Sequence, residues 1–107
     1  MPTSVRAAVS RAFGEPLIIE TLTLADPGPG EVRVRLDAVA ICHSDVSYAD
    51  GEWGGDLPAV WGHEAAGTIV EVGEGVGFEI GEHVVVTLIR SCGECARCQR
   101  GAEVACR

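Results

Sequence analysis

The stretch Val32-Arg33-Val34-Arg35-Leu36 decides the fold, because apolar and charged side chains alternate in it with a period of two. Successive side chains of a β-strand point to opposite faces, so this pattern predicts a strand with one face exposed to water. Segments rich in β-branched residues predict further strands on either side. The expected strands lie at residues 5–9, 17–24, 32–41, 67–72 and 83–89.

Glycine and proline separate these strands and mark turns at residues 26–30, 51–55 and 73–77. Short strands at this spacing favour a mainly β fold, a small β-barrel, over a parallel sheet. Val84-Val85-Val86 is apolar throughout, which predicts burial on both sides. A short helix is expected at about residues 44–49, directly after Cys42, with Ser44 as a possible cap.

Four of the five cysteines lie within fifteen residues, in the pattern Cys92-x2-Cys95-x2-Cys98-x7-Cys106. Short gaps let the thiolates turn inward on one loop, and Zn²⁺ prefers four such ligands in a tetrahedron. The pattern therefore predicts a structural zinc lobe at the C-terminal end. The alternative is a pair of disulfides, which needs an oxidising compartment, and no continuous apolar secretory signal precedes the first strand.

Composition excludes several classes of protein. Hydrophobic residues make up 47% of the 107 residues, which fits one globular domain rather than disorder. No apolar run approaches the length of a membrane span, so we expect no membrane association and a cytoplasmic location. The formal net charge of −8 makes nucleic-acid binding improbable, because binding to phosphates requires a basic face.

No dinucleotide-binding fingerprint is present. Gly73-x-Gly75 is followed three positions on by Phe78, where glycine or alanine would be needed, and no βαβ unit surrounds it. The loop is interpreted as a turn between two strands. The sequence therefore shows no nucleotide-binding domain.

A second set of metal-binding residue types lies between the expected strands. Cys42 and His63 offer a soft thiolate and an imidazole, a mixture suited to zinc, and Glu64 follows directly. On the residues alone, a metal site and an unrelated core thiol with a core-edge histidine are both open. No second histidine follows His63 at zincin spacing, so metalloprotease chemistry is excluded.

Taken together, the motifs resemble those of the zinc-dependent medium-chain alcohol dehydrogenases. The resemblance rests on Gly62-His63-Glu64-x2-Gly67-x5-Gly73-x2-Val76, with Cys42-His43-Ser44-Asp45 upstream and the four-cysteine run downstream. It extends from the first expected strand to Cys106. It implies that residues 1–107 are the N-terminal part of a GroES-like β-barrel catalytic domain, with the family's Rossmann cofactor domain absent from them.

The resemblance also implies roles for single residues. Cys42 and His63 would bind a catalytic zinc, with Glu64 beside it as an occasional ligand or electrostatic neighbour. Ser44 would accept the alcohol proton, and Asp45 would hydrogen-bond His63. His43 would lie near the cofactor pyrophosphate. Four residues would hold the structural zinc: Cys92, Cys95, Cys98 and Cys106.

Simpler interpretations exist for several of these residues. Ser44 and Asp45 could only cap and begin the short helix, where acids are favoured, and His43 could be an exposed polar side chain. His83 is read as structural. Trp53 could line a substrate pocket or pack in the core, Trp61 is read as packing, and Tyr48 is given no role.

Two features depart from the family pattern. Ser47 stands where a histidine often continues the proton relay, so the relay would end at Ser44 and cofactor hydroxyls or pass through water. The third catalytic zinc ligand, usually a cysteine, lies further downstream in the family, and no unassigned cysteine is left for it. We therefore expect a fragment of a dehydrogenase subunit that is inactive alone.

The expected parent protein is an NAD(P)-dependent oxidoreductase that interconverts an alcohol and its aldehyde or ketone. It would use Zn²⁺ in two places, NAD or NADP bound by the missing domain, and small-molecule alcohol or aldehyde substrates, and it would form a homo-oligomer. The alternative is a stand-alone zinc-stabilised interaction module, with the four-cysteine run as a staple and Cys42 as a core thiol.

Overall fold

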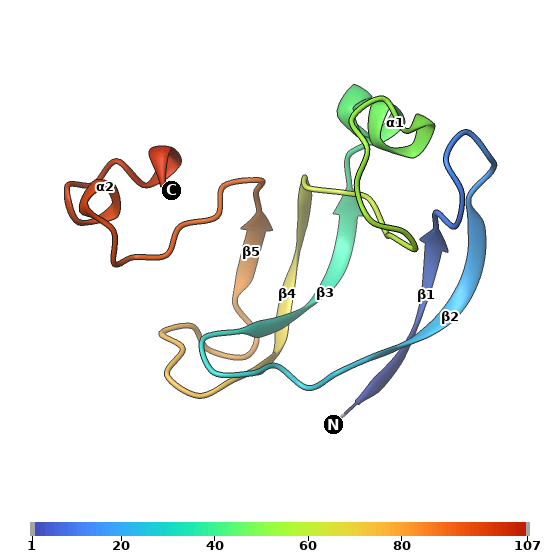
Figure 1. Ribbon diagram of the computed structural model, residues 1–107. Helices are drawn as coiled ribbons and strands as arrows, with labels where there is room; N and C mark the ends of the chain where they lie inside the picture. The colour runs from blue at the N-terminus through green and yellow to red at the C-terminus, as the bar shows by residue number, and fades with distance from the viewer. Residues whose placement is uncertain (1, 107) are drawn as a thin grey trace.

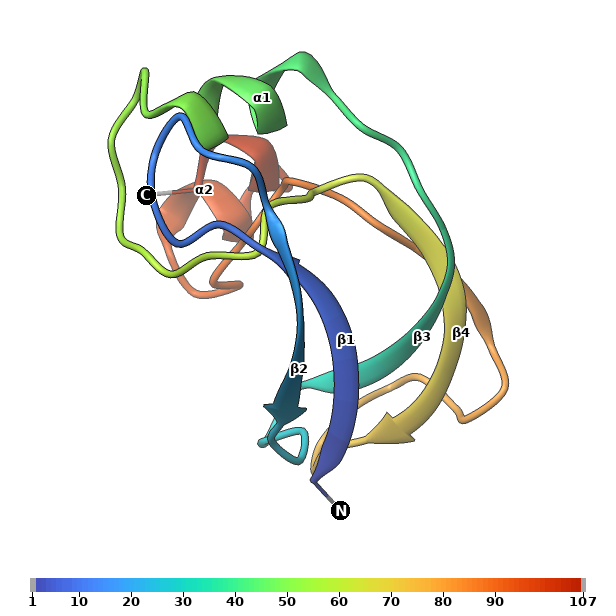
Figure 2. The ribbon, with the colours of Figure 1, turned by 90° about the vertical axis from the view of Figure 1, so that its right-hand side faces the viewer.

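The computed structural model describes residues 2–106, which form two small antiparallel sheets (Figure 1). The first sheet pairs β1 (Thr3–Val9) with β2 (Ile18–Leu24). The second has the order β3 (Val32–Val39), β4 (Ala65–Val72), β5 (His83–Val86). The predicted mainly β, barrel-like fold class is confirmed, and the strands bend strongly along their length (Figure 2).

Short helices complete the chain. α1 (His43–Asp50) lies beyond the ends of the strands, close to the loop that follows it (Figure 1). α2 (Ala96–Gln99) and the 3-10 turn η1 (Glu103–Ala105) form a C-terminal lobe that stands apart from the sheets. Within residues 2–106, no helix has the length and apolar character that crossing a bilayer requires.

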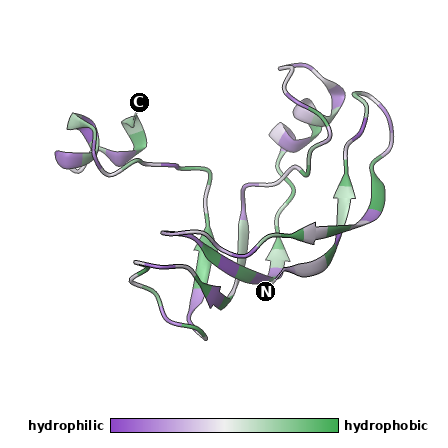
Figure 3. Cartoon of the chain, turned by 60° about the horizontal axis from the view of Figure 1, so that its bottom comes forward, coloured by the Kyte–Doolittle hydropathy of each residue, from purple (hydrophilic) through white to green (hydrophobic). Residues whose placement is uncertain are grey.

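The prediction that Val84-Val85-Val86 is buried on both sides is wrong. Val85 is 75% exposed and Val86 is 39% exposed. β5 pairs with β4 and forms an edge of its sheet, so part of its apolar surface meets solvent. The strand also ends at Val86, and the following residues run towards the cysteine lobe. Hydrophobic and hydrophilic residues alternate along several strands (Figure 3).

The prediction of one wet face on β3 holds for Arg35 but not for Arg33, whose side chain is only 11% exposed. Arg33 Nη1 donates to Thr3 Oγ1 at 2.9 Å, and Nη2 donates to the carbonyl oxygen of Ala25 at 2.7 Å. The guanidinium also forms an ion pair with Glu71 on β4. Arg33 thereby ties the two sheets together, because its partners belong to both.

Two further contacts position the segments that carry the candidate ligands. Ser10 and Ala59 exchange backbone hydrogen bonds of 2.8 and 3.0 Å, which fixes the chain shortly before His63. At the end of α1, Gly51 adopts a left-handed conformation with φ +84°, and a Cβ there would lie 2.8 Å from Phe13 Cγ. Only glycine allows this close approach between the β1–β2 connection and the helix.

We expect Arg33→Met to lower the free energy of unfolding by about 2 kcal/mol, because Glu71 and the Ala25 carbonyl would lose a mostly buried partner. Arg35→Met, on the same strand but exposed, should change it by less than about 0.5 kcal/mol. Urea unfolding followed by circular dichroism measures both. Equal effects of the two substitutions would contradict the role assigned to Arg33.

Candidate metal centres

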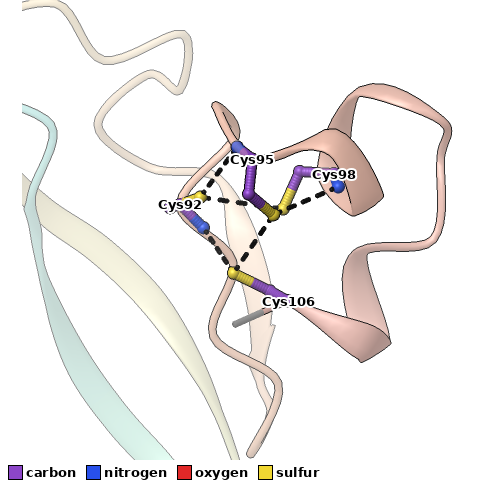
Figure 4. A group of neighbouring side chains, drawn as sticks. All are labelled: Cys92, Cys95, Cys98 and Cys106. Atoms are coloured by element: carbon purple, nitrogen blue, oxygen red, sulfur yellow. Dashed lines mark hydrogen bonds between the residues drawn. The ribbon is translucent and has the colours of Figure 1, made fainter.

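The C-terminal lobe brings its four cysteine sulfurs together (Figure 4). Cys92 Sγ lies 4.0 Å from Cys98 Sγ, and Cys95 Sγ lies 3.9 Å from Cys106 Sγ. All four sulfurs lie within 4.8 Å of one another. Within residues 2–106 no disulfide joins any of the cysteines, so the disulfide alternative does not describe this arrangement.

Backbone amides of the lobe point at the sulfurs. The amides of Cys95 and Glu94 donate to Cys92 Sγ at 3.2 and 3.4 Å, and the amide of Cys92 donates to Cys106 Sγ at 3.3 Å. Hydrogen bonds from Cys95 and Glu94 lower the pKa of Cys92. This loop geometry therefore favours a thiolate at Cys92.

The buried thiol of Cys98 behaves differently. A hydrogen bond from the backbone of Gly93 lowers its pKa, but desolvation and the three neighbouring thiols outweigh that bond and raise the pKa to about 12. Several thiolates crowded into one small space repel one another unless a cation lies among them. The lobe thus has the electrostatics of a site built around a positive charge.

The sulfur spacing fits a zinc ion. Zn–S bonds of about 2.3 Å in a tetrahedron place the sulfurs about 3.8 Å apart. The two sulfur pairs at 3.9 and 4.0 Å are close to that value. Four thiolates also form a closed coordination shell, the arrangement of structural rather than catalytic zinc sites.

A second cluster joins Cys42, His63 and Glu64, whose ligand atoms lie within 4.8 Å of one another. Cys42 precedes α1, whereas His63 and Glu64 directly precede β4. Cys42 and His63 are half-buried, and Glu64 is exposed. A thiolate, an imidazole and a carboxylate are donors that zinc accepts, and three protein ligands leave one position of a tetrahedron open.

Asp45 connects the two ligand-bearing segments. Its Oδ2 accepts a hydrogen bond from the Cys42 amide at 3.0 Å, and its Oδ1 lies 3.3 Å from His63 Nδ1. His63 Nε2 faces the other way and lies 4.0 Å from Glu64 Oε1. A proton on Nδ1 therefore faces a carboxylate, which leaves the lone pair of Nε2 for a metal.

The possible role of Ser44 as helix cap is wrong, because α1 begins at His43 and its N-cap is Cys42. The Asp45 side chain accepts from the N-cap amide instead, since the third helical position reaches back across the first turn. Asp45 also contacts His63. It therefore acts both as an acid in the first turn of the helix and as a partner of this histidine.

The sequence reasoning missed the contact between His43 and Ser47. Ser47 is buried, 3% exposed, and its Oγ lies 3.4 Å from Nδ1 of the exposed His43. Their spacing of four residues on a helix was the signal that could have revealed this pair. His83 lies across from Thr68, with Nδ1 3.2 Å from Oγ1, as a cross-strand pair. Trp53 is 59% exposed, which does not fit core packing.

A mostly apolar cavity of about 380 Å³ opens beside the second cluster. His63 and Glu64 form its polar end, and Ala65 with residues 85–89 forms the rest. A small organic molecule that enters it would reach the candidate ligands with its polar end while its apolar part stayed among aliphatic side chains.

Comparisons with known proteins agree with this architecture. Residues 28–107 match the alcohol dehydrogenase GroES-like domain family. A putative alcohol dehydrogenase D from Mycobacterium tuberculosis is 44% identical over 101 residues, which are 94% of this chain and 27% of that protein. The chain therefore spans about a quarter of the length of that relative.

Solved structures give the same result. An alcohol dehydrogenase zinc-binding domain protein from Burkholderia ambifaria superposes with a TM-score of 0.94 at 41% identity, over all of this chain and 29% of that one. An NAD-dependent alcohol dehydrogenase superposes with a TM-score of 0.86 at 43% identity, over 95% of this chain and 31% of that one.

The fold and the two donor clusters define a GroES-like β domain equipped for metal binding. The chain belongs to the zinc-dependent medium-chain alcohol dehydrogenase family, as residues 28–107 and the similar proteins show.

We expect Asp45→Ala to speed hydrogen exchange of the Cys42 amide about fivefold, because losing an N-terminal helix cap costs about 1 kcal/mol. Asp50→Ala, at the other end of α1, should leave that amide unchanged. Exchange measured by nuclear magnetic resonance compares the two variants. An unchanged rate in Asp45→Ala would contradict the hydrogen bond at the start of the helix.

Proposed function

We propose that the natural polypeptide carrying this chain is a zinc-dependent oxidoreductase that interconverts an alcohol and its aldehyde or ketone, with hydride transfer to NAD or NADP. The observation that carries the proposal is the meeting of Cys42, His63 and Glu64 beside an apolar cavity, in a chain of this family. Membership in a dehydrogenase family supports the reaction class.

Within this proposal, residues 1–107 are the N-terminal part of the catalytic domain, and residues outside this chain supply a Rossmann domain and the third zinc ligand. The lengths of the relatives support it, since the chain spans 27% of one of them. The accessible surface of 7824 Å² supports it as well. A compact monomer of 11.2 kDa would expose about 5,700 Å².

The proposed catalytic centre uses Cys42 and His63 as zinc ligands, with Glu64 as an occasional ligand or electrostatic neighbour. Zinc bound there would supply Lewis acidity that makes an alcohol proton easier to remove. Asp45 would fix the orientation of the His63 ring through Nδ1. The cavity beside His63 would contact and orient the apolar part of the substrate.

Ser44 is the proposed acceptor of the alcohol proton, because a hydroxyl both accepts and donates. It is half-buried and lies in the first turn of α1. Its neighbours in sequence are His43, which is exposed, and Asp45, which is half-buried. Ser47 stands where many relatives would carry a relay histidine, and it contacts His43. The proton would leave Ser44 through cofactor hydroxyls or water.

The remaining proposals concern cofactors, partners and location. His43 is exposed and would lie near the pyrophosphate of NAD or NADP. A second, structural zinc would be held by the four-cysteine lobe. The parent protein would act on small alcohols or aldehydes, form a homo-oligomer and reside in the cytoplasm.

We expect Cys98→Ser to remove one equivalent of tightly bound zinc and to unfold the lobe locally, because a structural zinc stabilises a small domain by about 10 kcal/mol or more. Cys42→Ser should leave that equivalent in place and weaken only the second site. Zinc content after gel filtration and amide exchange of residues 92–106 measure both effects. Undiminished zinc in Cys98→Ser would rule out the four-cysteine site.

We expect Ser44→Ala in the natural polypeptide to lower kcat about 100-fold, because it removes a positioned proton acceptor. Cys42→Ala should abolish turnover of a primary alcohol, measured by the formation of NADH or NADPH. Ser4→Ala, an exposed serine on β1, is the matched control and should turn over normally. Full activity in both Ser44→Ala and Cys42→Ala would sink the catalytic assignment.

A further inference from the structure

Three aromatic rings meet between α1 and the segment that carries His63. The ring of Tyr48 stacks on Trp61 with a centroid distance of 5.0 Å and an interplanar angle of 14°. Trp53 meets the same tyrosine ring edge-on, at 4.8 Å and 88°. Tyr48 is thus contacted by two indoles of the loop that joins α1 to His63, one near each end of that loop.

The position of these rings relates them to the second donor cluster. Tyr48 lies on α1, whose N-cap is Cys42, and Trp61 lies two residues before His63. Between Trp61 and His63, Gly62 has φ +150°, a backbone conformation that side chains with a Cβ rarely adopt. The Tyr48–Trp61 stack therefore joins the two segments whose side chains supply the thiolate and the imidazole.

Stacking rather than polar contact holds Trp61 in place. Its Nε1 is buried, and among residues 2–106 it has no hydrogen-bond partner. Its ring lines two small cavities, one shared with His63 and Val39 and the other with Asp45 and Val46. The ring of Trp61 therefore lies close to both His63 and the first turn of α1.

The ends of β3 and β4 tie the same two segments, because the Ala40 amide donates to the carbonyl oxygen of Glu64 at 2.9 Å. Asp45 supplies the polar link, through the Cys42 amide and His63 Nδ1. The connecting loop contains Gly51, Gly54 and Gly55, all with positive φ, so its backbone has little intrinsic stiffness. The Ser10–Ala59 backbone pair holds this loop against the end of β1, and the aromatic stack adds a restraint between the loop and α1.

We propose that Tyr48 is a positioning residue for the second metal centre: by stacking on Trp61 it restrains α1 against the segment that carries His63, in addition to the strand pairing that ends at Ala40 and Glu64. The proposal rests on the proposed function, because it presupposes that these two residues hold a metal. Tyr48 touches neither substrate nor metal in this assignment. Its effect passes through Trp61 and through α1.

The test uses three variants of the natural polypeptide. Tyr48→Leu removes the ring, and Tyr48→Phe keeps the ring but removes the hydroxyl. Phe13→Leu is the matched control, because Phe13 and Tyr48 are both 37% exposed. Phe13 packs against the other end of α1, at Gly51. The control therefore reports any general loosening of the helix.

Co²⁺ is the probe. The four-cysteine lobe is first filled with one equivalent of Zn²⁺, and Co²⁺ is then added in competition with a chelator. Binding is followed by the visible absorption of thiolate-bound Co²⁺ and by quenching of tryptophan fluorescence. Urea unfolding of each metal-free variant measures its stability separately.

We expect Tyr48→Leu to weaken Co²⁺ binding at this centre about 2- to 10-fold and to alter its absorption bands, because a pair of stacked rings is lost. Tyr48→Phe should retain the affinity and spectrum of the unsubstituted protein, and Phe13→Leu should retain the spectrum. Unchanged affinity and bands in Tyr48→Leu would overturn the inference, and so would equal spectral changes in Phe13→Leu. If the unsubstituted protein bound no second metal ion, the proposed metal centre itself would be wrong.

Discussion

Residues 2–106 bury very few apolar side chains completely, and the rest of the structure follows from this constraint. Val9 and Ile69 are 2% and 1% exposed, whereas Ile41 and Leu88 are 84% and 74% exposed. Apolar burial is the dominant favourable term in folding. A core this small therefore has to be supplemented by other interactions. Directional polar ties supplement it, and each of them joins parts of the chain that are distant in sequence. Arg33 links the two sheets, and Asp45 links α1 to His63.

The cysteine lobe is the extreme case of the same constraint. Cys98 is its only described residue in the buried class, and Val104 is 77% exposed. A loop of this kind cannot offset the entropy of ordering its backbone by burial alone. The missing stabilisation would come from binding a cation. Backbone amides donate to the sulfurs, and the four sulfurs lie close enough together to surround such a cation. We therefore expect metal binding by this lobe to be coupled to the ordering of its backbone.

The sequence predicted what depends on local patterns and missed what depends on distant contacts. Segments rich in β-branched residues located all five described strands to within a few residues, and cysteine spacing located the lobe, because both signals are local. The burial of Val85 was wrong, since a strand's pattern does not reveal whether a neighbour will cover it. Arg33 looked like a solvent-facing charge, and only the approach of Thr3 and Glu71 buries it. Tyr48 received no role because its partner Trp61 lies across a loop. The Cys42–His63 centre was predicted through family resemblance, and the residues alone left it open.

The two donor clusters differ in the property that separates a scaffold from a catalyst. Four thiolates satisfy zinc completely, so a cation in the lobe would have no vacant position and could only hold the loop. Cys42, His63 and Glu64 offer a mixed set in which one member, Glu64, is exposed. If these residues held a metal ion, the exposed Glu64 would be the ligand that most easily gives way to an oxygen atom from the apolar cavity that His63 and Glu64 border. Because Asp45 holds His63 from the opposite side, ligand exchange at Glu64 need not disturb the imidazole. With Cys42 and His63 as ligands and Glu64 only an occasional one, a metal ion held there would keep a coordination position open, which Lewis-acid catalysis requires and a structural site does not.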